Sequence, residues 1–217
     1  MIGKDVKVIE YSERIDFLNC TTHAVGAIAA VPLGVLLFLK AEGFRENFSV
    51  IVYSVALFAV YIFSTVYHGL KPSEKKRKAR LLDHSAVPLL IAGTATPCAL
   101  ISLYRVSMSH SIFVFVLAWS CTLFGIFSKF FFFEKLKAVT MAVYMISGAL
   151  MLLVTVPLLG EINTDGFSKL VIGCVFYVIG AIFCGLGIKR EIFHPIFHIF
   201  VLFGSFCHYY VIYNFVL

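Results

Sequence analysis

The sequence predicts an all-α membrane protein, a single bundle of seven transmembrane helices spanning residues 1–217. Two observations carry this prediction. Hydrophobic residues make up 60% of the chain and charged residues only 14%, whereas soluble domains are roughly 25% charged. The apolar residues also form long continuous runs and not an alternating pattern, which favours membrane helices over a β-barrel. The chain is long enough for one such bundle and leaves little room for a second domain.

The apolar runs define the helices, because a spanning helix needs about 20 apolar residues. A polar, acidic segment precedes the first run, so we expect an uncleaved anchor and not a signal peptide. Gly69 and Pro72 follow the second run and end its helix. Residues 160–166 form a polar turn before the sixth run, and Pro195 is tolerated in the first turn of the seventh. The expected helices cover approximately residues 18–39, 48–70, 82–104, 110–128, 138–159, 167–188 and 194–216.

The distribution of Lys and Arg predicts the orientation. With seven crossings, one side of the membrane receives the N-terminal segment, the 71–80 loop, the 129–137 loop and the pair Lys189–Arg190. These segments hold fourteen of the eighteen basic residues. The positive-inside rule therefore places the N-terminus in the cytoplasm and the C-terminus outside. Length and charge pattern fit a multi-pass protein of the bacterial inner membrane.

The net charge of +6 does not indicate a nucleic-acid partner, because the basic residues lie in short loops and act as topology signals. The six cysteines form no C-x2-C pair and lie mostly inside apolar runs. We therefore expect them to pack as small hydrophobic residues, without a disulfide framework.

Three histidines are the candidate ligands of a metal. His194 and His198 follow H-x3-H spacing, which places both imidazoles on one face of a helix. In the predicted topology His68 lies at the same depth, near the cytoplasmic face. A buried imidazole in lipid is costly without a partner, and zinc bound by all three residues would supply one. The competing interpretation is that they are ordinary hydrogen-bonding residues of the bundle.

Two further residues complete the candidate site. Three protein ligands leave the fourth zinc position for water, which is the arrangement of catalytic zinc sites. Ser64 lies one turn before His68 on the same helical face and is a candidate for holding that water or a substrate oxygen. Asp83 begins the third helix at matching depth, either as a general base or as an acceptor for a ligand N–H.

The other polar residues are expected outside the site. On a helix the side chain of His84 diverges by about 100° from that of Asp83, and His208 lies about 15 Å beyond His198. His23 is expected to be a hydrogen-bonded bundle residue. Glu13 and Asp16 are expected to be solvated near the interface.

Four blocks of the sequence resemble the hemolysin III family, bacterial relatives of the progestin and adipoQ receptors. The blocks are E-R-I-D-F-L-N-C-T-T-H-A-V-G (13–26), S-T-V-Y-H (64–68), L-D-H-S-A-V-P-L-L-I-A-G-T-A-T-P (82–97) and H-P-I-F-H-I-F-V-L-F-G-S-F-C-H (194–208). The resemblance implies seven helices with a cytoplasmic N-terminus. It also implies zinc at His68, His194 and His198, with Asp83 and Ser64 in the same polar cluster. The wider superfamily includes alkaline ceramidases, which suggests hydrolysis of a lipid amide.

Three functions compete at this point. The leading hypothesis is a zinc-dependent hydrolase of a lipid amide or ester, with a membrane lipid as substrate. The second is a receptor or membrane-state sensor whose zinc is structural and ties two helices together. The third is a pore, which is disfavoured because the polar residues gather near one face of the membrane. A cytoplasmic N-terminus argues against a G-protein-coupled receptor, and the lack of a lysine in the seventh run excludes a retinal pump. The sequence does not indicate an oligomeric state.

Overall fold

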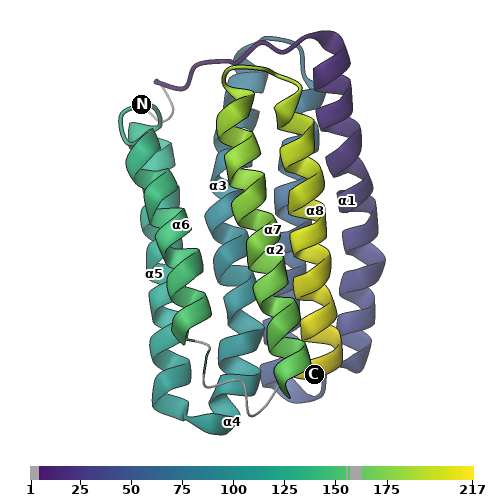
Figure 1. The fold of residues 1–217 in the computed structure, drawn as a ribbon, viewed down its shortest axis with the longest axis vertical. Coiled ribbons are helices and arrows are strands. Elements are labelled where there is room, and N and C mark those ends of the chain that lie inside the picture. Colours follow the sequence, from purple (N-terminus) through teal and green to yellow (C-terminus); the bar gives the residue numbers. More distant parts are fainter. Residues whose placement is uncertain (1–4, 155, 157–162) are drawn as a thin grey trace.

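The computed structural model describes residues 5–154, 156 and 163–217, and these residues form helices and no strand. The helices run roughly parallel and antiparallel to one axis in a single bundle (Figure 1). Their bounds are α1 Glu13–Lys40, α2 Gly43–Gly69, α3 Glu74–Pro97, α5 Met108–Phe132, α6 Lys137–Val154, α7 Asn163–Gly187 and α8 Phe193–Val211. α3 continues through the π-helical segment η1 (Cys98–Leu103) into the short helix α4 (Tyr104–Val106), and α8 continues into η3 (Ile212–Val216).

Six of these helical rods are long and apolar enough to cross a membrane: α1, α2, α3 with its continuation, α5, α7 and α8. The expected helix at 138–159 corresponds to α6, whose described part ends at Val154. The expected turn at 160–166 lies partly outside the described residues, and its last four residues already belong to α7. Pro195 lies in the first turn of α8, as predicted.

The third helix begins eight residues earlier than expected, and the prediction of a basic loop over 71–80 is wrong for its second half. Ser73 caps α3, because its hydroxyl accepts a hydrogen bond from the backbone N–H of Lys76 at 3.2 Å. The basic residues that follow are good helix formers, and their long stems can lie along apolar surface while the charge reaches water. The helix therefore continues out of the apolar run toward the polar end of the bundle.

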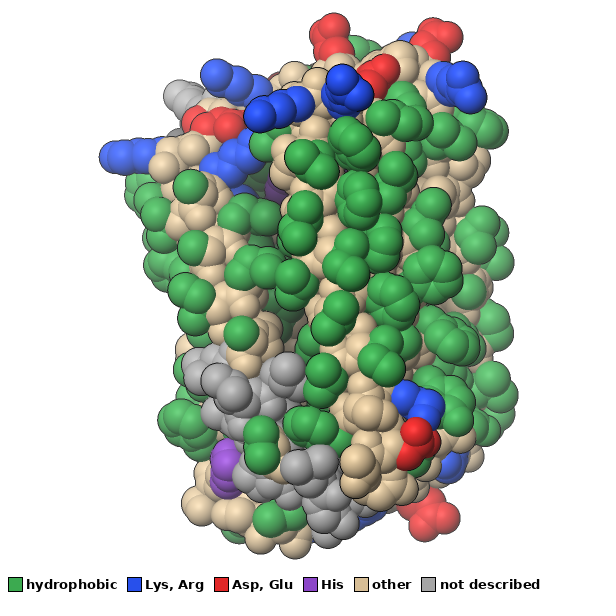
Figure 2. Space-filling model, viewed as in Figure 1, with side chains coloured by type: hydrophobic (Ala, Val, Ile, Leu, Met, Phe, Trp, Pro, Cys, Tyr) green, Lys and Arg blue, Asp and Glu red, His purple; other side chains and the backbone are tan. Residues whose placement is uncertain are grey.

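The outer surface is hydrophobic along the middle of the bundle, and Lys, Arg, Asp and Glu gather at its two ends (Figure 2). Large apolar side chains such as Ile28, Leu39 and Ile188 are at least 74% exposed. Small residues fill much of the interior, including Ala56 of α2 against Gly93 of α3. Close packing of small residues inside and apolar residues outside is the pattern of a helical membrane protein.

Candidate metal centre

The three predicted ligand histidines meet at one end of the bundle. His68 is the penultimate residue of α2, and His194 and His198 occupy the first two turns of α8. Each contributes one ring nitrogen to a group whose atoms all lie within 4.8 Å of one another. His68 and His198 are 2% and 1% exposed, and His194 is partly exposed. Convergence from two helices more than 120 residues apart in sequence is what a shared ligand requires.

Hydrogen bonds to residues of α1 determine which ring nitrogen of His68 and of His198 is free to bind a metal. Nδ1 of His68 lies 2.9 Å from Oδ1 of Asp16. Since a carboxylate can only accept, Nδ1 is the donor, and Nε2 keeps its lone pair. Nε2 of His68 is buried and has no hydrogen-bond partner among the described residues. In His198, Nδ1 lies 3.2 Å from the carbonyl oxygen of Asn19, which again leaves Nε2 free.

This arrangement fits a zinc ion. Zinc binds neutral imidazole through a lone pair, and its histidine ligands commonly donate their other N–H to a carboxylate or a backbone carbonyl. The carboxylate here is Asp16 and the carbonyl is that of Asn19. The buried Nε2 of His68, which has no partner in the described part of the chain, is the atom that a metal would satisfy.

The expectation that Asp16 is simply solvated is therefore wrong. Its second oxygen accepts a hydrogen bond from Nζ of Lys76 at 2.6 Å, and the Lys76 side chain is fully buried. The carboxylate thus joins α1, α2 and α3 at the site. A buried ammonium needs a counter-charge, and Asp16 meets that need and orients His68 at the same time.

Ser64 and Asp83 lie beside this cluster on neighbouring helices. Ser64 is 2% exposed on α2, one turn before His68. Asp83 is partly exposed on α3, and its carboxylate interacts with the Ser64 hydroxyl. Among the described residues, Asp83 is not a hydrogen-bond acceptor for the His68 or His198 ring. Its two predicted roles, general base and acceptor for a ligand N–H, both remain predictions.

His23 departs from its predicted role as a hydrogen-bonded bundle residue. Its ring stacks on that of His198, with centroids 3.7 Å apart and planes 12° apart, and packs edge-on against Tyr61. Both of its ring nitrogens are buried without a hydrogen-bond partner among the described residues. His23 is therefore a packing neighbour of the candidate ligands.

The remaining histidines, His84, His110 and His208, lie outside the cluster, as predicted for His84 and His208. His84 packs its ring edge-on against Phe133, with centroids 5.0 Å apart. Nε2 of His208 lies 3.2 Å from the carbonyl oxygen of Leu170, between α7 and α8.

The N-terminal segment covers the cluster. The ring of Tyr11 lies 5.5 Å from that of His68 and 5.2 Å from that of His194. Next to it, the backbone N–H and the hydroxyl of Ser12 both donate to the carboxylate of Glu191, at 2.8 and 2.7 Å. Glu191 lies in the short connection before α8, so this pair fixes the start of α8 against α1. Burial raises the pKa of the Tyr11 hydroxyl, which therefore stays protonated as a hydrogen-bond donor.

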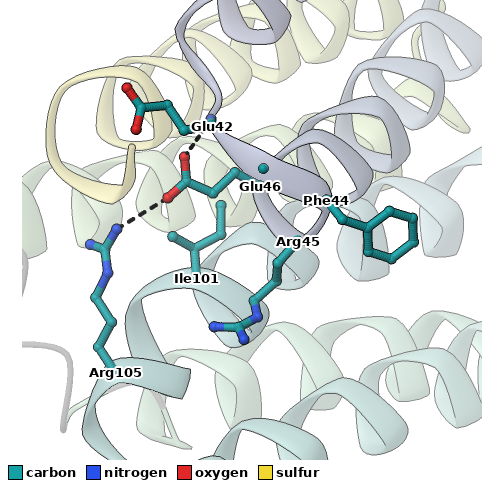
Figure 3. A pocket seen from close by; sticks show the side chains of 7 residues that line it. Glu42, Phe44, Arg45, Glu46, Ile101 and Arg105 are labelled. Atoms are coloured by element: carbon teal, nitrogen blue, oxygen red, sulfur yellow. Dashed lines mark hydrogen bonds and ion pairs between the residues drawn. The ribbon is translucent and has the colours of Figure 1, made fainter.

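A cavity of about 430 Å³ lies at the opposite end of α2. Figure 3 shows Arg105 pointing toward Glu46 across this cavity, and their side chains form an ion pair of 3.3 Å. Glu46 and His68 are separated by about 33 Å along α2. The cavity is therefore separate from the histidine cluster.

Fold and site together define a class: a multi-pass helical membrane protein with a buried cluster of three histidines. Residues 12–209 match the model of the haemolysin-III-related family. The chain is 35% identical over 193 residues to Hemolysin-3 of Bacillus cereus, covering 88% of this chain and 86% of that protein. It is 31% identical over 198 residues to a Hemolysin-3 homolog of Bacillus subtilis, covering 90% and 91%. The human monocyte to macrophage differentiation factor is 28% identical over 205 residues, covering 91% and 82%.

The chain belongs to the haemolysin-III-related family. The predicted resemblance to hemolysin III is thereby confirmed, and so is its character as a membrane protein with several apolar helices.

Proposed function

We propose that this protein is a zinc-dependent hydrolase of a lipid amide or ester, with zinc bound by His68, His194 and His198. The observation that carries the proposal is the free, buried Nε2 of His68 within a group of three imidazole nitrogens no more than 4.8 Å apart. Three protein ligands leave a coordination position open, as in catalytic zinc sites.

We also propose how the chain is oriented in the membrane. Seven crossings, with α6 as the fifth, place the N-terminus and the histidine cluster on the cytoplasmic side of a bacterial inner membrane. The termini lie at opposite ends of the bundle, which supports an odd number of crossings (Figure 1). The basic residues of the N-terminal segment and of the start of α3 lie at the end that holds the cluster, which supports this orientation.

Each site residue has a distinct part in such a reaction. Zinc, when bound, polarises a carbonyl and lowers the pKa of its water. Asp16 and the Asn19 carbonyl keep the N–H of His68 and of His198 turned away from the open side. Asp83 accepts a proton there, and Ser64 orients the Asp83 carboxylate or a substrate oxygen. The lipid-facing surface would admit the acyl chain of the substrate directly from the membrane.

A second function is a membrane-state sensor or receptor in which zinc is structural. One observation favours it: α8 packs mainly against α7 and α1, so ligands from α2 and α8 would join helices that are otherwise weakly connected. Removal of the metal would then loosen the bundle. A third candidate, a pore, has no such support.

The experiment that tests the leading proposal is turnover of a panel of lipid amides and esters by the purified, zinc-loaded protein. We expect hydrolysis that disappears in Asp83→Asn while zinc stays bound. A zinc-loaded wild type without turnover on any substrate, and with a bundle that melts on chelation, would support the sensor instead.

A further inference from the structure

A second polar cluster lies between α3, α5 and α6, on the side of α3 away from α2. Its central residue is Lys129, in the last turn of α5. Lys129 is 1% exposed, and its Nζ has no hydrogen-bond partner among the described residues. An ammonium at this depth is costly without a counter-charge, so a lysine that stays here points to a ligand.

Two hydroxyl groups of α5 and α6 are unsatisfied as well. The Ser128 hydroxyl, next to Lys129, and the Tyr144 hydroxyl of α6 are buried without partners among the described residues. Nζ of Lys129 lies 6.0 Å from the centre of the Tyr144 ring. Gly125 makes room for this phenol, since a Cβ at that position would lie 3.1 Å from the Tyr144 hydroxyl oxygen. The Lys129 ammonium and the Tyr144 hydroxyl therefore lie at the same contact between α5 and α6.

The charges around Lys129 make the cluster positive. Lys137 and Arg80 add to its potential, and Glu134 opposes it. However, Glu134 is already bound to Arg80, with Nη1 to Oε1 at 3.0 Å. The ring of Phe133 lies 4.9 Å from Nζ of Lys129 and stabilises a cation, but it supplies neither a negative charge nor a hydrogen-bond acceptor. A net positive, donor-rich site of this kind recognises an anion.

The surroundings of the cluster are those of a lipid headgroup. Phe131 and Phe132, at the end of α5, are 52% and 40% exposed on the lipid-facing surface. Phe133, the next residue, is buried against Val6 and Leu81. In Figure 2 the surface is hollowed between α6 and α7, with Lys and Arg side chains at the upper end of the hollow.

We propose that Lys129 and Tyr144 bind an anionic phosphate group, supplied by the headgroup of an acidic membrane phospholipid. Nζ of Lys129 provides the charge, and the Tyr144 hydroxyl donates to a phosphate oxygen. The acyl chains lie against the exposed phenylalanines of α5. The site is separate from the histidine cluster and does not depend on the proposed hydrolase activity.

The test compares full-length wild type with Lys129→Gln and with Lys135→Gln, an exposed lysine in the loop after α5. Each protein is titrated in neutral detergent with phosphatidylglycerol, phosphatidylcholine or inorganic phosphate, and thermal stability and retained lipid are measured. We expect phosphatidylglycerol to raise the Tm of wild type and Lys135→Gln, with about tenfold weaker apparent affinity for Lys129→Gln. If inorganic phosphate also raises the Tm, the site recognises the phosphate group and not the rest of the lipid.

Equal responses of wild type and Lys129→Gln, or equal responses to both lipids, would overturn the proposal. If Lys129→Gln does not fold, Tyr144→Phe serves instead, because it removes one donor and leaves the charge in place. Lys129→Met gives a further distinction. The Tm of this variant should be below that of wild type only when phosphatidylglycerol is present. If the wild-type ammonium had no ligand, its removal would make the variant more stable than wild type in every lipid.

Discussion

The carboxylate of Asp16 lies 2.9 Å from Nδ1 of His68 and 2.6 Å from Nζ of Lys76, so one side chain connects α1 and α3 to a candidate metal ligand on α2. This relationship fixes the tautomer of His68. It also makes the first helix part of the site, although none of the three candidate ligands lies on it.

Replacing Asp16 by Asn should weaken zinc binding while the fold is retained. Loss of a carboxylate behind a histidine ligand typically costs 10- to 100-fold in metal affinity. Because Lys76 would then be buried without its partner, the double variant Asp16→Asn with Lys76→Met keeps the bundle stable. Zinc competition with a chelator measures the effect, and Asp165→Asn, an exposed acid on α7, is the control. An unchanged affinity in the double variant would remove Asp16 from the site.

Asp83→Asn should abolish most turnover without loss of zinc. A positioned general base contributes about 10²- to 10⁴-fold to the rate. Zinc should stay bound, because the candidate ligands are the three grouped histidines and do not include Asp83. Ser64→Ala should give a smaller loss of the same kind. Rates per bound zinc are the quantity to compare. If Asp83→Asn lost its zinc, the carboxylate would be part of the metal's coordination and not the base.

His23→Phe should retain zinc. The phenyl ring preserves the stacking on His198 and removes two buried nitrogens that have no partner among the described residues. The free energy of unfolding should stay the same or rise by about 1–3 kcal/mol. Metal content and thermal unfolding check this expectation. Loss of zinc in this variant would identify His23 as a fourth ligand.

Gly173→Ala should destabilise the contact between α7 and α8. A Cβ on Gly173 would collide with the ring of His208 and would lie 3.2 Å from Cβ of Cys207. His208 is held by the Leu170 carbonyl and has little freedom to move. Overpacking of this kind costs about 1–3 kcal/mol. Gly185→Ala in the same helix is the control, because no atom of the described residues lies within 4 Å of its added Cβ. A variant at Gly173 as stable as this control would contradict the close packing.

Periodicity and spacing predicted much of this molecule. The apolar runs gave the helices, and H-x3-H spacing gave the shared face of His194 and His198. Helical spacing alone could also have grouped Asp16, Asn19 and His23, because positions i, i+3 and i+7 lie on one face of a helix. The sequence could not show that this face of α1 packs between α2 and α8, because that depends on tertiary contacts.

Charged residues near the membrane interface were the main source of wrong predictions. A short acid at the start of a helix and a lysine in a basic run usually face water. Asp16 and Lys76 instead pair with each other, and only their three-dimensional proximity reveals it. The burial of Lys129 likewise depends on tertiary packing, here of α5 against α6.

The three-histidine metal site is tested by the metal content of the detergent-purified protein, measured by mass spectrometry. Wild type and His198→Ala are compared, with His110→Ala as a control outside the cluster. We expect about one zinc per chain in wild type and in the control, and none in His198→Ala. Equal metal content in all three proteins, or no metal in wild type purified with zinc present, would contradict it.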